Sequence, residues 1–87
     1  MNVVHKFPLP DVESAVEMPA GAEIVDIREQ PGGQICLWAI VNTAAIRHQI
    51  RHFVGVFTGA PIPSQAEYVK TAHLSNGLVV HYFEVNR

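Results

Sequence analysis

Charged side chains are scarce in this sequence. They make up 16% of its 87 residues, against about 25% in an average globular protein. The formal net charge is -2, and the one local basic cluster consists of Arg47, His48, Arg51 and His52. This cluster suits a small anion, whereas extended nucleic acid needs a basic stripe along its phosphates, so we expect no extended nucleic acid as partner. Low charge also leaves neutral surface uncovered, which favours a homo-oligomer.

Cysteine is almost absent, with Cys36 as its single representative. One thiol excludes an internal disulfide and a zinc site built from several thiolates. Cys36 lies in an apolar run, so we interpret it as a buried small hydrophobe. No apolar stretch approaches the length of a membrane helix, about 20 residues, and residues 1–6 lack the apolar core of a signal peptide. We therefore expect a cytoplasmic protein with no membrane partner.

Short segments rich in β-branched and aromatic residues alternate with Gly and Pro, a pattern typical of strands and turns. Their number and spacing predict one all-β domain over residues 1–87, a small, mainly antiparallel sandwich or open barrel of six to seven meandering strands. The predicted strands are Asn2–Phe7, Glu13–Met18, Glu23–Glu29, Gln34–Asn42, Ile46–Thr58, Tyr68–Leu74 and Leu78–Val85.

Two turns are the clearest local signals. Asn76-Gly77 predicts a tight hairpin, and Gln30-Pro31-Gly32-Gly33 predicts another, because Pro fixes one φ and Gly supplies a positive one. Ser64–Glu67 reads as a capping box, so at most one short helical turn is expected there. The stretch Asn42–Arg51 is open to a second interpretation, in which it begins as a helical turn before becoming strand.

The apolar patterns also predict which strand faces are covered. Gln34–Asn42 is apolar on both faces, which is typical of a central strand covered on each side. In Ile46–Thr58 the even-numbered positions, such as Val54 and Val56, resemble a core face. Gly55 suggests a bulge or bend where this strand changes partners.

The odd-numbered face of Ile46–Thr58 carries the best candidate binding residues. Arg47 and Arg51 are followed by Phe53 and Phe57, and guanidinium groups beside aromatic rings can stack a base, pair a phosphate or grip an acidic protein patch. The adjoining Thr58 and Gly59 offer a hydroxyl and free backbone N–H groups for a small anion. An ordinary amphipathic strand that covers a partner subunit has the same composition.

Catalytic and metal-binding patterns are weak. His48 and His52 lie four residues apart, which on a strand is about 13 Å and too far for one metal, although the same spacing on a helix would suit zinc. No serine stands in a nucleophile elbow. We therefore predict no metal, no cofactor and no enzymatic activity, with a small hydrolase as the least favoured reading.

Several pieces occur in order along most of the chain: Met18-Pro19-Ala20-Gly21-Ala22-Glu23-Ile24, Cys36-Leu37-Trp38-Ala39, and Thr58-Gly59 followed by Pro61-Ile62-Pro63. Through them the sequence resembles a family of small uncharacterised proteins encoded by phages and prophages. The resemblance implies a phage or prophage origin and a stand-alone domain, but no activity. Together with the composition it leads us to expect a binding protein, such as a host-defence inhibitor that sequesters a ligand or blocks a protein. The alternative is an assembly accessory of a phage particle.

Overall fold

The computed structural model describes residues 1–86, and their secondary structure consists of strands and turns without a helix. The all-β prediction is therefore confirmed, with seven antiparallel strands. Since the described chain is built of strands, it holds no helix that would traverse a lipid bilayer. The strands are β1 (Asn2–Pro8), β2 (Glu13–Pro19), β3 (Glu23–Glu29), β4 (Ile35–Asn42), β5 (His48–Phe57), β6 (Ala66–His73) and β7 (Val79–Val85).

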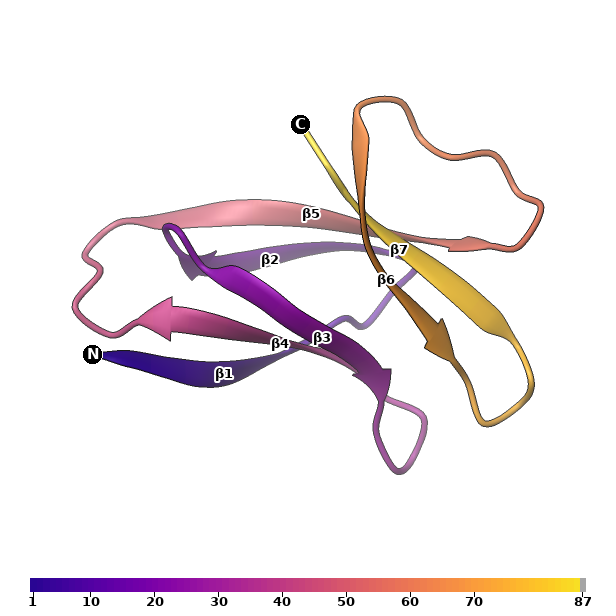
Figure 1. Cartoon of the computed structure of the whole chain (residues 1–87), viewed down its shortest axis with the longest axis horizontal. Coiled ribbons are helices and arrows are strands. Elements are labelled where there is room, and N and C mark those ends of the chain that lie inside the picture. Colours follow the sequence, from indigo (N-terminus) through magenta and orange to yellow (C-terminus); the bar gives the residue numbers. More distant parts are fainter. Residues whose placement is uncertain (87) are drawn as a thin grey trace.

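The strands form two sheets, so the fold is a sandwich (Figure 1). One sheet has three strands in the order β1-β4-β3, and the other has four in the order β2-β5-β7-β6. The chain passes between the sheets after β1, after β2 and again after β4. The expected meander was therefore wrong beyond its two hairpins, because β1 and β2 find partners far along the sequence.

The two predicted hairpins are confirmed as β3–β4 and β6–β7. In the second, Gly77 has a φ of 89° and its N–H donates to Leu74 O at 3.0 Å. The helical turn expected at Ser64–Glu67 is wrong, because Gln65 has a φ of 54° and Ala66 already begins β6. Asn42–Arg51 likewise contains a non-helical turn, after which β5 starts at His48.

The main core lies between the sheets and contains Leu9, Val16, Met18, Ala22, Ile27, Leu37, Ala39, Val41, Phe53, Ala72, Val80 and Tyr82. Phe53 comes from the odd-numbered face of β5, so the main core lies on that face, and the expectation of an even-numbered core face is confirmed only for the smaller cluster that holds Val54 and Val56. The even-numbered side chains of β5 point to the outer face of the four-stranded sheet, where Val54 and Val56 join a second, smaller cluster. Both faces of this strand carry apolar residues, which is why alternation alone pointed the wrong way.

β4 is central in its sheet, as predicted, with β1 on one side and β3 on the other. Its inner face enters the core, and Cys36 on its outer face is buried, as expected. The expectation that β4 is covered on each side was wrong, because no strand of residues 1–86 packs on the outer face of this sheet. The predicted bulge at Gly55 is also wrong, since β5 keeps a regular register there. The bulges lie in β3, between Ile24 and Asp26, and in β6, between Tyr68 and Lys70.

Candidate functional site

The outer face of the four-stranded sheet carries an apolar cluster. Val54, Val56, Phe83 and Val85 are each less than 10% exposed, and Ala66 packs against them. The register of β5 and β7 sets Val54 opposite Phe83, so these side chains share one face. A sheet face that points away from the main core is normally polar. This cluster is therefore a second apolar core, separate from the one that joins the two sheets.

A pocket of about 250 Å³ opens beside this cluster, beneath the loop that connects β5 to β6. Figure 1 shows this loop bowing outward between the end of β5 and the start of β6. Three large apolar side chains at the pocket are well exposed, namely Phe57 at 48%, Ile62 at 60% and Tyr68 at 60%. The full lining is Val56, Phe57, Thr58, Gly59, Ala60, Ile62, Tyr68, His81 and Phe83. We call this the loop pocket.

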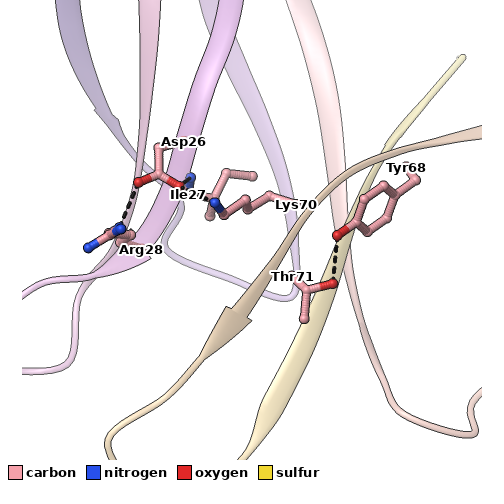
Figure 2. Close-up of polar contacts among 6 residues, drawn as sticks. All are labelled: Asp26, Ile27, Arg28, Tyr68, Lys70 and Thr71. Atoms are coloured by element: carbon pink, nitrogen blue, oxygen red, sulfur yellow. Dashed lines mark hydrogen bonds and ion pairs between the residues drawn. The ribbon is translucent and has the colours of Figure 1, made fainter.

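A continuous chain of hydrogen bonds crosses the polar side of the loop pocket. The His81 ring lies between two hydroxyls, with Nε2 at 2.8 Å from Thr58 Oγ1 and Nδ1 at 2.9 Å from Thr71 Oγ1. Thr71 Oγ1 lies 2.7 Å from the Tyr68 hydroxyl, as Figure 2 shows. The ladders align these residues, because Thr71 and Val56 are the partners of His81 on β6 and β5.

This hydrogen-bond chain can run in either direction. A neutral imidazole donates from one ring nitrogen and accepts at the other, and each hydroxyl both donates and accepts. If His81 donates to Thr58, the Thr58 hydroxyl hydrogen is free to donate into the pocket. If Thr58 donates to His81, its lone pairs face the pocket instead. The polar edge of the loop pocket can therefore meet a donor or an acceptor without leaving a group unpaired.

The predicted binding residues lie in three separate places. Phe57, Thr58 and Gly59 line the loop pocket. Arg51 and Phe57 lie six residues apart on β5, about 20 Å, so the arginine cannot serve the loop at Thr58-Gly59. Arg47 is exposed in the connection before β5.

Arg51 and Phe53 point into the sandwich. The Arg51 guanidinium makes two 2.7 Å hydrogen bonds to Glu84 and a further one to the backbone oxygen of Ala22. It also lies 5.9 Å from the centre of the Phe53 ring, which is 1% exposed. The hydrogen bonds to Glu84 raise the pKa of Arg51 above its ordinary value, against the effect of burial. The guanidinium and aromatic groups thus meet, but inside the fold.

Sequence reasoning missed the pocket residues His81 and Tyr68, and also Thr71, which hydrogen-bonds to both. The available signal was the alternation in Val79–Val85, which places His81 on the same face as Phe83. Within the described residues, no three His, Cys, Asp or Glu side chains gather closely enough to hold a metal ion. His48 and His52 both lie on β5, where strand spacing keeps them apart.

Comparison with known proteins finds one family. The family model described as Domain of unknown function (DUF7352) matches residues 1–87, the whole of this sequence. No curated protein and no solved structure matches the chain.

Proposed function

The chain belongs to the DUF7352 family, and we propose that this member is a non-enzymatic binding protein whose loop pocket takes a small, uncharged, flat ring. The observation that carries the proposal is the His81 ring held between two threonine hydroxyls at the edge of an apolar pocket. Apolar walls with a few placed polar groups are what small-molecule sites in proteins generally share.

The size and charge of the loop pocket limit the range of ligands that fit it. Its volume of about 250 Å³ lies just below the range of pockets for drug-sized ligands, about 300–1,000 Å³. A single ring or a fused ring pair, such as a nucleobase, suits that volume and the neighbouring aromatic side chains. Lys and Arg are missing from the described lining, so the ring and its hydrogen-bonding edge, rather than a phosphate, supply the recognition.

The experiment is a thermal-shift screen of free bases, nucleosides and nucleotides, with the binding site mapped by amide chemical shifts. We expect nucleosides to raise the melting temperature and nucleotides to do no better, with shifts concentrated in residues 56–62 and 81–83. Thr58→Val keeps the side-chain shape and removes the hydroxyl, so it should weaken binding about tenfold. Arg47→Ala, on an exposed residue outside the pocket, is the matched control. A panel without any shift at the pocket would overturn the proposal.

The sequence resemblance implies a phage or prophage origin, so we propose that this binding acts inside an infected host cell. A small protein that holds a nucleobase without converting it would act by sequestering a host signal, one molecule per pocket. A role as assembly accessory is the alternative, and it predicts co-purification with capsid or tail proteins instead of a nucleoside.

A second candidate activity rests on one distance. Thr58 Oγ1 at 2.8 Å from His81 Nε2 is within reach for a hydroxyl nucleophile and its base, with Thr71 orienting the far ring nitrogen. Incubation with an activated ester distinguishes the two. Acylation at Thr58, seen by peptide mass spectrometry and lost in Thr58→Val, would favour an acyl-transfer enzyme over a binding protein.

A further inference from the structure

The outer face of the three-stranded sheet is apolar along its centre. Trp38 is half-buried there, next to Ile40 two residues along β4. Val4 on β1 is the ladder partner of Ile40 and is 58% exposed, and Val25 at the β3 bulge is 53% exposed. No strand of residues 1–86 covers these side chains. A hollow of about 390 Å³ beside the tryptophan is lined by Val4, Val25, Asp26, Arg28, Gln30 and Trp38.

Charge on this face is divided between its two edges. Lys6 on β1 is the ladder partner of Trp38, and its neighbours on this face of the strand are uncharged. Across β4, the β3 edge carries Glu23 opposite Ile40, Asp26 opposite Trp38 and Arg28 opposite Cys36. Asp26 is bound to Arg28 and Lys70. In the described part of the chain, Lys6 and Glu23 have no ion-pair partner, so one free cation and one free carboxylate flank the apolar strip on opposite sides.

We propose that this face is the interface of a homodimer whose two-fold axis runs parallel to β4. Rotation by 180° about such an axis lays β1 of one copy over β3 of the other and keeps each position along the strands. Lys6 then lies level with Asp26 of the second copy and two residues along the strand from Glu23, the free carboxylate of that edge, and the same contact occurs again by symmetry. Trp38 of each copy approaches the axis beside the hollow of the other.

The charge pattern selects this axis over the other way of stacking the same two faces. An axis in the plane of the sheet but perpendicular to the strands lays β1 over β1. With the axis at the level of Trp38, Lys6 would then face Lys6 of the second copy, and like charges at the rim of an interface disfavour that arrangement. Aligned packing of two sheets is also the usual geometry of sandwiches, with the apolar side chains of both inner faces interdigitated.

The size of the face sets the strength of the dimer. Three strands at 4.8 Å spacing and seven residues at 3.3 Å give a patch of about 14 by 23 Å. That is well below the area of about 800 Å² that each partner buries in a standard stable complex. We therefore expect a reversible dimer that forms at protein concentrations of about 10–100 μM or above.

Sedimentation and the fluorescence of Trp38, the single tryptophan, test the proposal on the full chain. Raising the concentration should move the protein from monomer to dimer and shift the Trp38 emission to the blue. Lys6→Glu and Glu23→Lys should each weaken dimerisation about tenfold, because each reversal places like charges together twice in a symmetric dimer. The double variant Lys6→Glu/Glu23→Lys should restore it. Glu67→Lys, the same charge change on exposed β6, should leave it unchanged.

Val4→Asp tests whether the dimer forms through this face rather than through another part of the surface. Position 4 is exposed in the free chain, so the variant should keep its strand content by circular dichroism and lose the dimer. A monomer at several hundred μM would overturn the proposal. So would a dimer that survives Val4→Asp and is lost in Ile50→Asp, because Ile50 lies on the outer face of the other sheet.

Discussion

Arg51 joins three parts of the chain through one guanidinium group. It bonds both carboxylate oxygens of Glu84 on β7 and the backbone oxygen of Ala22, just before β3 on the opposite sheet. The side chains are only 16% and 27% exposed. Arg51→Ala leaves the Glu84 carboxylate partly buried without its partner, so we expect urea unfolding to show a loss of about 1–3 kcal/mol.

The matched variants separate the ion pair from simple truncation. Glu84→Ala should cost a similar amount, and Arg51→Ala/Glu84→Ala should cost less than the sum of the two, because neither charge is then stranded. None of these changes should affect binding in the loop pocket, because Arg51 and Glu84 point to the inner face of the four-stranded sheet and the pocket opens on its outer face. Strictly additive losses would contradict the structural role, and a loss of ligand binding with intact folding would return Arg51 to the binding site.

At the scale of the element, Gly55 explains how β5 sits against β7. It is the ladder partner of Tyr82, and a Cβ added there would lie 2.8 Å from Val80 Cγ1 and 3.1 Å from Tyr82 Cε1. Glycine is needed for this close approach rather than for a bulge. Gly55→Ala should therefore destabilise the protein by about 1–3 kcal/mol through overpacking, as measured by thermal or urea unfolding.

Measuring Gly55→Ala in a second sequence background tests whether its cost comes from the contact with Val80. In a Val80→Ala variant the nearest clashing atom is gone, so Gly55→Ala should cost less than it does in the natural sequence. An equal cost in both backgrounds would mean that the loss comes from backbone entropy or from Tyr82 alone.

The strands themselves were largely predictable because Gly and Pro punctuate the chain at short intervals, and each strand lies within about two residues of its predicted ends. The covered face of β5 was not predictable. Its even positions carry Val54 and Val56 and its odd positions carry Phe53, and both sets are buried, in two different clusters. A strand with two covered faces leaves no alternation that says which cluster is the main core.

Only part of the candidate site was predictable for a related reason. Phe57, Thr58 and Gly59 are adjacent in sequence, so the end of a strand and the start of a loop could be read directly. Tyr68 and Thr71 reach the same face only because β6 has a bulge between Tyr68 and Lys70. One inserted residue changes which side chains share a face, and nothing in the local composition of β6 announces it.

For the molecule as a whole, the free edges of the two sheets meet along β3 and β6. Lys70 on β6 lies 3.1 Å from Asp26 on β3, and Arg28 binds the other oxygen of the same carboxylate at 2.6 Å, as Figure 2 shows. Each strand has its bulge directly before the residue that joins the sheets. Bulges and charges on edge strands oppose pairing with another chain. The ion pair of Asp26 with Lys70, with Arg28 on the same carboxylate, therefore joins the two sheets on this side of the sandwich, and both edges oppose the addition of a further strand.

The same ion pairs of Asp26 make the stability of the sandwich depend on pH. Burial raises the pKa of Asp26, but hydrogen bonds from Lys70, Arg28 and the Ile27 N–H outweigh it, so the pKa lies below its ordinary value. A folded-state pKa below the unfolded one gives stabilisation that is complete above the ordinary value and is lost as the pH falls through the folded one. Asp26→Asn should thus cost about 0.5–1 kcal/mol at pH 7, because the pair is partly exposed to solvent.

The informative quantity is the difference in unfolding free energy between the natural protein and Asp26→Asn, measured by urea unfolding from pH 7 to pH 2. Other carboxylates titrate equally in both proteins and cancel in this difference. It should be constant above about pH 5 and shrink below about pH 4, as Asp26 is protonated. Lys70→Met should reduce the same difference, because it removes one of the two cations. A difference that does not change with pH would show that Asp26 acts through its hydrogen bond to Ile27 rather than through its charge, and the two sheets would then be held together by their core alone.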